Sequence, residues 1–312
     1  RWEARLDSRL ALLHKVRGNN TEARALIERA IARAAEGGAV DETPALWAML
    51  SILHRRERDP IASQRAALAG LRVARGVSHR DDRFREDVAQ LLLGLAVSLY
   101  SRKLWLRAER AYRQAARTVR EETSPHIVSL CLNGIAGCRF GRGDLATARE
   151  MLLSSLKFKE RCGDLHQIAI ARSNLAEVEL RLGHAAAALD HARASVRLGE
   201  HLHVASDLPD MHRNLAEALL ATSDPDAALT AALRALELVT RGGARVYLAE
   251  TAATLAKVCH ALLASPASTP AAARAALAAA ALTAVLDQHF DTPELRRKAD
   301  DLRALLAPAL AP

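Results

Sequence analysis

Two short stretches forty residues apart decide how this chain folds: NLAEVELRLG at residues 174–183 and NLAEALLATS at residues 214–223. They share their first four residues and the same rhythm of apolar positions. Apolar residues that recur every three to four positions are typical of an amphipathic helix. The chain therefore carries an internal repeat, and a period of this length indicates a repeated supersecondary unit.

Three columns of small residues extend the repeat along most of the chain. The middle column recurs at intervals of 39, 46, 40, 40, 40 and 45 residues: Ala23, Ala62, Ala108, Ala148, Ala188, Ala228 and Ala273. The residues twelve positions before and seven positions after each of these are also small, except Leu50. Short side chains let two helices approach closely, so the columns predict about seven units of packed helices.

Each unit is predicted to be a helix, a turn and a second helix. Residues 166–182 have helical spacing, Gly183 interrupts it, and residues 185–202 resume it. Elsewhere a capping residue followed by proline marks the start of a helix, as at Ser124-Pro125 and Asp224-Pro225. One such hairpin cannot bury its apolar face alone, so neighbouring hairpins are expected to stack into a solenoid.

The solenoid is predicted to cover residues 1–288, followed by a polar capping helix and tail at 289–312. The predicted units lie near residues 1–38, 43–76, 83–122, 124–163, 165–203, 205–242 and 244–288. No stretch between them is long enough to separate two domains. The fold class is therefore expected to be all-α, with essentially no sheet.

The three small-residue columns resemble those of the tetratricopeptide repeat superfamily. In that superfamily a short residue late in the first helix, and others twelve and nineteen residues later, hold the hairpin together. The period near 40 is similar to the longer-helix variants of kinesin light chains and MalT-type bacterial regulators, although the family's early Trp, its Tyr and its closing Pro are mostly absent. The resemblance implies a right-handed α-α superhelix whose first helices line a concave groove for a peptide or protein, and it implies no catalysis.

Composition narrows the classes of function. Half of the residues are hydrophobic, but no apolar run reaches the roughly 20 residues of a membrane span. The four cysteines, Cys131, Cys138, Cys162 and Cys259, form no CxxC pair, which favours a reducing cytoplasm over a disulfide or zinc framework. The chain begins with Arg1 and has no leader-like start, so it is expected to be a piece of a longer protein.

Signatures of enzymes and metal sites are missing from the sequence. It contains no phosphate-binding loop, no nucleophile elbow, no HExxH and no GxGxxG. The tripeptide at residues 79–81 matches a kinase catalytic-loop fragment but lacks the rest of that motif. His201, His203, Asp210 and His212 have no reinforcing second pair of ligands. We therefore predict no catalytic residue, no metal and no cofactor.

The face of the first helices is the predicted binding surface. Steps of four, three and four residues return to one side of a helix, and the resemblance places that side in the groove. The candidate partner-binding residues selected in this way are Gly134, Gly137, Asn174, Glu177, Arg181, Asp210, Asn214 and Glu217. The asparagines resemble groove residues that grip a peptide backbone in relatives, and the glutamates predict a preference for a basic ligand segment.

The glycines on this face have two possible explanations. A glycine inside a helix costs about 0.5 to 1 kcal/mol relative to Ala, so Gly134, Gly137 and Gly141 on one face need a reason. Something approaches the backbone closely at these positions. It is either a neighbouring helix that packs there, or a ligand that lies on the bare backbone.

A second candidate surface is basic. Arg110, Arg113, Arg117 and Arg120 share one face of a predicted helix, opposite an apolar stripe that includes Tyr112. An ordinary solvated outer face explains this pattern, and with a net charge of +8 a phosphate-rich partner is the alternative.

The sequence thus predicts a protein- or peptide-binding scaffold, expected to be the sensor or docking portion of a larger bacterial signalling or regulatory protein. Its partner is a protein, a peptide or another domain of the parent chain, and a nucleic-acid-binding solenoid is the alternative function.

Overall fold

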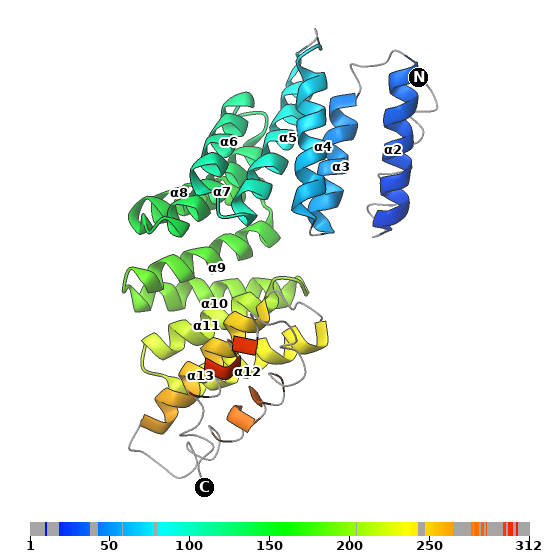
Figure 1. The fold of residues 1–312 in the computed structure, drawn as a ribbon. Helices are drawn as coiled ribbons and strands as arrows, with labels where there is room; N and C mark the ends of the chain where they lie inside the picture. The colour runs from blue at the N-terminus through cyan, green and yellow to red at the C-terminus, as the bar shows by residue number, and fades with distance from the viewer. Residues whose placement is uncertain are drawn as a thin grey trace. The chain divides into compact units, whose positions relative to one another are not determined.

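The computed structural model describes residues 10, 19–37, 43–57, 59–77, 80–203, 205–242 and 247–264, together with short pieces between residues 276 and 304. Figure 1 shows that the secondary structure of these residues is helical throughout, and no strand occurs among them. The predicted all-α class is confirmed. None of the described helices is both long and apolar enough to cross a membrane.

The chain divides into two compact units, residues 1–162 and 163–312. The first unit contains α2 (Asn20–Glu36), α3 (Thr43–Arg56), α4 (Pro60–Ala74), α5 (Asp82–Ser101), α6 (Trp105–Thr118), α7 (Pro125–Gly141) and α8 (Leu145–Cys162). The second unit contains α9 (Leu165–Arg181), α10 (Ala185–His201), α11 (Leu208–Ala221), α12 (Pro225–Gly242) and α13 (Leu248–Ala264). Consecutive helices pack as the predicted hairpins: α3 with α4, α5 with α6, α7 with α8, α9 with α10 and α11 with α12.

The hairpins of each unit also pack on one another through their first helices. In the first unit α5 contacts α3 and α7, and in the second unit α11 contacts both α9 and α13. Side chains on the first helices can therefore reach across two or three successive repeats, which is how a solenoid buries a continuous core. The prediction also covers the residues before 19, residues 265–275 and the C-terminal capping helix. These lie largely outside the described residues.

The small-residue columns form the contacts between the two helices of each hairpin. Ala108, Ala148, Ala188 and Ala228 are each fully buried four residues into their helices. The second predicted unit was placed one residue out of register. There Ser51 and Ser63 are fully buried and take the column positions that the sequence assigned to Leu50 and Ala62.

Serines in these columns also close the hairpins by hydrogen bonds. The Ser63 hydroxyl donates to the carbonyl oxygen of Ser51 at 3.0 Å. In the same way, Ser155 donates to the carbonyl oxygen of Ser129 and Ser195 to that of Ala169, both at 2.8 Å. A column residue therefore must be small, and where it is a serine its buried hydroxyl needs a partner, which the carbonyl oxygen of the facing helix supplies.

The turns inside the hairpins use one backbone conformation. Gly143 and Gly183 have φ of 81° and 83°, and Lys103 and Ser223 occupy the same turn position with φ of 57° and 62°. Glycine reaches this left-handed region without steric cost, which explains why it recurs at the end of a first helix. The predicted cap at Asp224 is confirmed, because its carboxylate accepts the backbone N–H of Ala227 at 3.1 Å. At Ser124 the helix begins where predicted, but the hydroxyl bonds to Glu86 and does not cap the helix.

Candidate functional site

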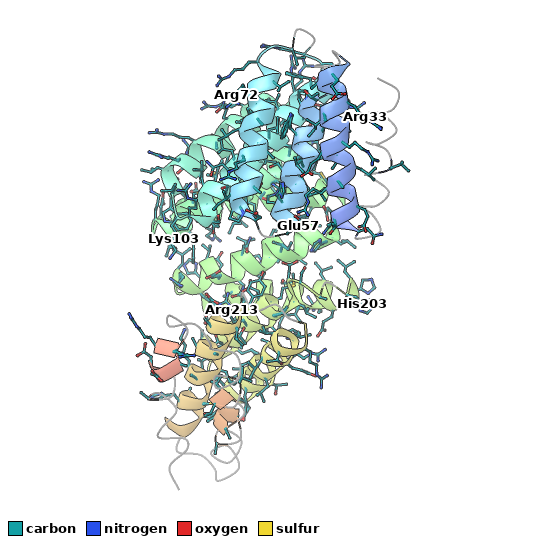
Figure 2. All side chains as sticks on the ribbon, turned by 45° about the vertical axis from the view of Figure 1, so that its right-hand side comes forward. Arg33, Glu57, Arg72, Lys103, His203 and Arg213 are labelled. Carbon is teal, nitrogen blue, oxygen red and sulfur yellow. The ribbon has the colours of Figure 1, made fainter. Side chains whose placement is uncertain are left out.

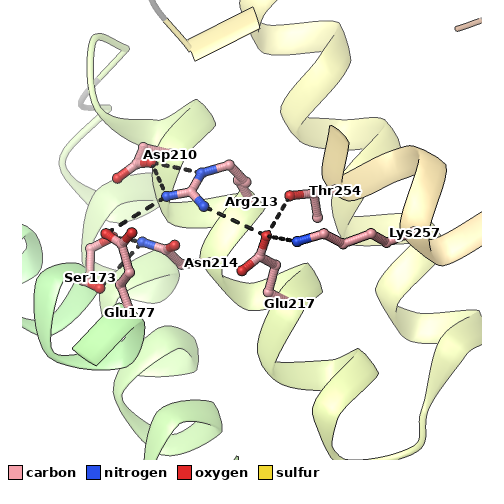
Figure 3. Close-up of polar contacts among 8 residues, drawn as sticks. All are labelled: Ser173, Glu177, Asp210, Arg213, Asn214, Glu217, Thr254 and Lys257. Atoms are coloured by element: carbon pink, nitrogen blue, oxygen red, sulfur yellow. Dashed lines mark hydrogen bonds and ion pairs between the residues drawn. The ribbon is translucent and has the colours of Figure 1, made fainter. Parts of the chain in front are cut away.

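The candidate site lies on the first helices of the second unit. Helices α9, α11 and α13 repeat every forty residues, so their equivalent positions align. One column of equivalent positions consists of Asn174, Asn214 and Thr254. Glu177, Glu217 and Lys257 share a second column, one turn further along each helix. Figure 3 shows the polar contacts made at these columns, and we call the eight residues that it draws the first-helix cluster: Ser173, Glu177, Asp210, Arg213, Asn214, Glu217, Thr254 and Lys257. Asn214 contacts Ser173, and the other six residues are linked to one another through Arg213 and Glu217.

Arg213 is the centre of the first-helix cluster (Figure 3). Its Nη2 and Nε donate to Oδ1 of Asp210 at 2.7 and 3.0 Å. The same guanidinium lies 3.8 Å from Glu217 on its own helix and 4.0 Å from Glu177 on α9. The Arg213 side chain is only 10% exposed, whereas the side chains of Asp210, Glu177 and Glu217 remain 23%, 31% and 24% exposed. The cation is thus buried beneath the carboxylates that it holds.

The two asparagines of the first column are placed differently. Asn214 is fully buried, and its Nδ2 donates to the hydroxyl of Ser173 at 2.8 Å and to the carbonyl oxygen of Ser173 at 3.3 Å. Its Oδ1 has no hydrogen-bond partner among the described residues. Asn174 is half-buried. The amide of Asn214 therefore joins helix α11 to helix α9. It could contact a ligand, as the sequence predicted, only if these two helices rearranged.

The third helix of the cluster is bound through Glu217. The hydroxyl of Thr254 donates to Oε1 of Glu217 at 2.8 Å, and Nζ of Lys257 lies 3.4 Å from the same oxygen. The Lys257 side chain is 60% exposed. The cluster therefore presents carboxylates over α9 and α11 and one exposed ammonium group over α13.

The two glutamates of the cluster differ in acidity because they differ in hydrogen bonding. Burial raises the pKa of Glu177 above its ordinary value, and the positive charge of Arg213 offsets this only partly. Burial also acts to raise the pKa of Glu217, but the hydrogen bond from Thr254 and the charges of Lys257 and Arg213 together lower it below its ordinary value. Glu177 is thus the carboxylate that would gain most from an additional positive charge.

The glycines of α7 belong to the first unit, and aromatic rings lie against them. A Cβ atom at Gly134 would come within 2.3 Å of the Tyr112 ring, and one at Gly137 within 2.9 Å of the Tyr100 ring. A Cβ atom at Gly141 would likewise come within 2.8 Å of the Trp105 ring. The structure supports the first explanation for these glycines, which is the packing of a neighbouring helix. Aromatic side chains cover the backbone that a ligand would have to contact.

The remaining candidate residues lie as follows. Asp210 is part of the first-helix cluster, and Arg181 is exposed at the end of α9. Sequence reasoning missed Ser173 and Arg213 as members of the site. Arg213 could have been found, because it stands three residues after Asp210 and four before Glu217, where helical ion pairs form.

The basic face is exposed as predicted, and one buried carboxylate organises its centre. Arg113 contacts Oε1 of Glu109 at 2.7 Å, and Arg139 also donates to that oxygen at 2.7 Å. Arg142 lies 3.3 Å from Oε2 of the same carboxylate. Glu109 is only 5% exposed, so α6 carries its single acidic residue beneath its arginines.

Among the residues that the structure describes, the histidines and cysteines show no arrangement that binds a metal. His201 and His203 are exposed, whereas His212 is buried on α11, where burial lowers its pKa. Within the described part of the chain, no three His, Cys, Asp or Glu residues are grouped for coordination. Burial raises the pKa of Cys131 and Cys138 to about 12, which keeps these thiols protonated and unreactive.

Comparisons with known proteins identify the fold. No protein-family model matches the sequence, and no curated protein matches it. Among solved structures, a Rap protein complexed with competence and sporulation factor has a TM-score of 0.60 at 13% identity, and the match covers 98% of this chain and 99% of that chain. Aspartyl phosphate phosphatase F from Bacillus subtilis has a TM-score of 0.64 at 12% identity, and the match covers 99% and 72% of the two chains.

A tetratricopeptide repeat protein from Parabacteroides merdae is similar over the full length of both chains, 100% of each, with a TM-score of 0.56 at 13% identity. Similarity at these identities establishes the fold alone. The chain therefore has the fold of tetratricopeptide repeat proteins, a stack of paired helices, which is the fold that the resemblance of its sequence implied.

Proposed function

We propose that the chain is a protein- or peptide-binding repeat scaffold that binds its partner on the first-helix cluster of α9, α11 and α13. The observation that carries the proposal is the arrangement around Arg213, in which one buried cation holds three partly exposed carboxylates across two helices. Charges held in place by one another are preorganised, so a ligand does not have to order them on binding. The resemblance to tetratricopeptide repeats supports this choice, since it implies that first helices line a groove.

The chemistry of the cluster favours a ligand with a basic side chain at one end. The carboxylates of Glu177 and Asp210 are more exposed than the guanidinium beneath them, and the pKa of Glu177 is raised by burial, so an incoming cation would be stabilised there. At the other end the exposed Lys257 fits a carboxylate of the ligand. The ligand is a segment of another protein or of another domain of the parent chain, in a bacterial signalling or regulatory pathway of the cytoplasm, and no catalytic step is assigned to the chain.

Selection from a random-peptide display library on the purified chain tests this proposal. We expect the enriched peptides to carry an Arg or Lys, and their affinity for the Glu177→Gln/Asp210→Asn variant to fall by about tenfold or more. Glu237→Gln is the matched control, because Glu237 is also paired with arginines but lies on α12, outside the cluster. Circular dichroism would verify that both variants keep their helix content.

Two outcomes would contradict the proposed site. The first is a library that yields no enriched sequence above a selection without protein. The second is a set of peptides that bind the Glu177→Gln/Asp210→Asn variant as tightly as the unaltered chain, which would place the binding surface elsewhere.

A further inference from the structure

The outer faces of the second helices can be compared position by position, because the repeats are in register. We define the outer stripe as the five positions equivalent to Leu106, Arg110, Arg113, Arg117 and Arg120 of α6 and the residues that follow it. In the hairpin of α4, with the corrected register, these positions are Ile61, Arg65, Leu68, Arg72 and Arg75. All ten side chains are exposed, and Leu106, Ile61 and Leu68 are 56%, 58% and 43% exposed.

The outer stripes of the later second helices are different. The stripe of α8 is Ala146, Glu150, Leu153, Lys157 and Glu160, and that of α10 is Ala186, Asp190, Arg193, Arg197 and Glu200. Both carry acidic and basic residues, as solvated outer faces usually do. The stripes of α4 and α6 instead hold only arginines and aliphatic residues, so a general tendency of the repeat does not explain them. Like charges at helical spacing repel one another, which gives this composition a cost.

The arginines of these two stripes are mostly unpaired. Arg113 contacts the buried Glu109, and Arg120 lies 4.0 Å from Asp82. The part of the chain that the structure describes offers no ion pair to the other arginines of the stripes, which are Arg65, Arg72, Arg75, Arg110 and Arg117. Figure 2 shows Arg72 on the outside of the first unit.

Both stripes belong to the same body of packed helices. Helix α5 packs against α4 on one side and α6 on the other, and Leu71 of α4 packs against the core that contains Tyr112 of α6. On α6, Arg110 and Arg117 are separated by about 10 Å along the helix at 1.5 Å per residue. A protein segment with carboxylates every three to four residues matches this spacing.

We propose that the outer stripes of α4 and α6 bind an acidic, amphipathic segment of a second protein partner. Its carboxylates pair with the arginines, and its aliphatic side chains cover Ile61, Leu68 and Leu106. Other helices than those of the first-helix cluster carry the stripes, and the proposal does not depend on the function proposed for that cluster.

Charge and composition favour a protein over the other polyanions. A nucleic acid would leave the three exposed aliphatic side chains uncovered, and the aromatic residues of α6 are half-buried at Trp105 and buried at Tyr112, where no base can stack on them. A membrane surface requires the apolar and basic residues of a helix to lie on separate faces. Here Ile61 and Leu68 alternate with Arg65 and Arg72 along one stripe, so insertion would carry guanidinium groups into the lipid.

The test uses the whole chain and fluorescence anisotropy with a labelled helical peptide that carries Glu and Leu at helical spacing. Two matched peptides replace every Glu by Gln, or every Leu by Ser. A labelled DNA duplex and vesicles containing an anionic phospholipid are the competing probes. We expect the Glu and Leu peptide to bind more tightly than either matched peptide and more tightly than the duplex or the vesicles.

Charge reversal assigns the binding to the stripes. Arg110→Glu/Arg117→Glu should weaken the Glu and Leu peptide by about tenfold or more, and Arg110→Gln/Arg117→Gln by a smaller factor of the same sign. Arg193→Glu/Arg197→Glu is the control, since it reverses the charge of two arginines of the α10 stripe, and it should alter the affinity by less than about twofold. Leu106→Ser should weaken the peptide by about threefold or more.

Three results would overturn the proposal. One is tighter binding of the DNA duplex or the anionic vesicles than of the Glu and Leu peptide, with the same dependence on Arg110 and Arg117. Another is an equal effect of the α6 and α10 charge reversals, which would indicate a response to net charge alone. The last is no measurable binding of the peptide.

Discussion

Replacement of Arg213 by methionine would reveal how strongly the first-helix cluster depends on its one buried cation. Methionine keeps the length of the aliphatic side chain but removes the guanidinium that lies within 4.0 Å of Asp210, Glu177 and Glu217. Loss of one partner of a buried ion pair costs about 3 to 5 kcal/mol. Because the three carboxylates keep between 23% and 31% exposure, and therefore part of their hydration, we expect about 2 to 3 kcal/mol.

Arg234→Met is the matched control for this prediction. Arg234 and Glu237 are also three residues apart on one helix and also 2.7 Å apart, but the Arg234 side chain is 47% exposed. An exposed ion pair of this kind contributes between about 0 and 1 kcal/mol. The two variants therefore share the geometry of one ion pair, but Arg213 is more deeply buried and lies near two further carboxylates.

The assay is urea denaturation followed by circular dichroism, at pH 7 and at about pH 4.5 for each variant. In Arg213→Met the carboxylates of Glu177 and Glu217 lose a cation that lowers their pKa, so their folded-state pKa values rise, and the stability they forfeit at pH 7 is recovered as they take up protons at lower pH. The difference from the unaltered chain should thus shrink at the lower pH. Equal losses for Arg213→Met and Arg234→Met at pH 7 would refute the reasoning.

Two further predictions concern the first unit. Gly134→Ala should lower the urea midpoint, because the added Cβ would lie 2.3 Å from the buried Tyr112 ring, and overpacking of about 1 to 3 kcal/mol exceeds the gain of about 1 kcal/mol in helix propensity; a raised midpoint would contradict it. Burial raises the pKa of Asp87 from 3.8 to about 6, so its contribution to stability is present below about pH 4 and is lost as the pH rises through 6. Asp87→Asn should therefore raise the urea midpoint at pH 7 and leave it nearly unchanged at pH 4, and an equal change at both values would exclude this cause.

The hairpins could be predicted from the sequence because their contacts are local and repeat. Small residues such as Ala148 and Ala188 mark where two helices must approach, whatever surrounds them. The column register was assigned wrongly at Leu50, where the interval between units changes. An alanine-rich stretch offers a small residue at either of two registers there. Serine there, at Ser51 and Ser63, was the better indicator, since its buried hydroxyls form a reciprocal pair of bonds.

The site was less predictable because its polar residues interact across helices that only the packing brings together. Asn174 and Asn214 are equivalent in sequence, yet only Asn214 is fully buried, because it faces Ser173 of the preceding repeat. Similarly, the reason for Gly134 could not be predicted without knowing that Tyr112 packs against it, because Tyr112 is 22 residues earlier and on another helix. A periodic pattern identifies equivalent positions, but the side chain that occupies the space in front of each one is specific to each repeat.

The hydrogen bonds that close the hairpins bear on how the chain folds in time. Ser155 and Ser195 each reach a carbonyl oxygen 26 residues earlier, within the same hairpin. Contacts over such short separations require little loop-closure entropy, and proteins dominated by them fold quickly. Each hairpin can then serve as a nucleus on which its neighbours are added in either direction along the chain. The refolding rate should consequently depend little on which hairpin carries a destabilising substitution, in contrast to proteins with a single obligatory nucleus.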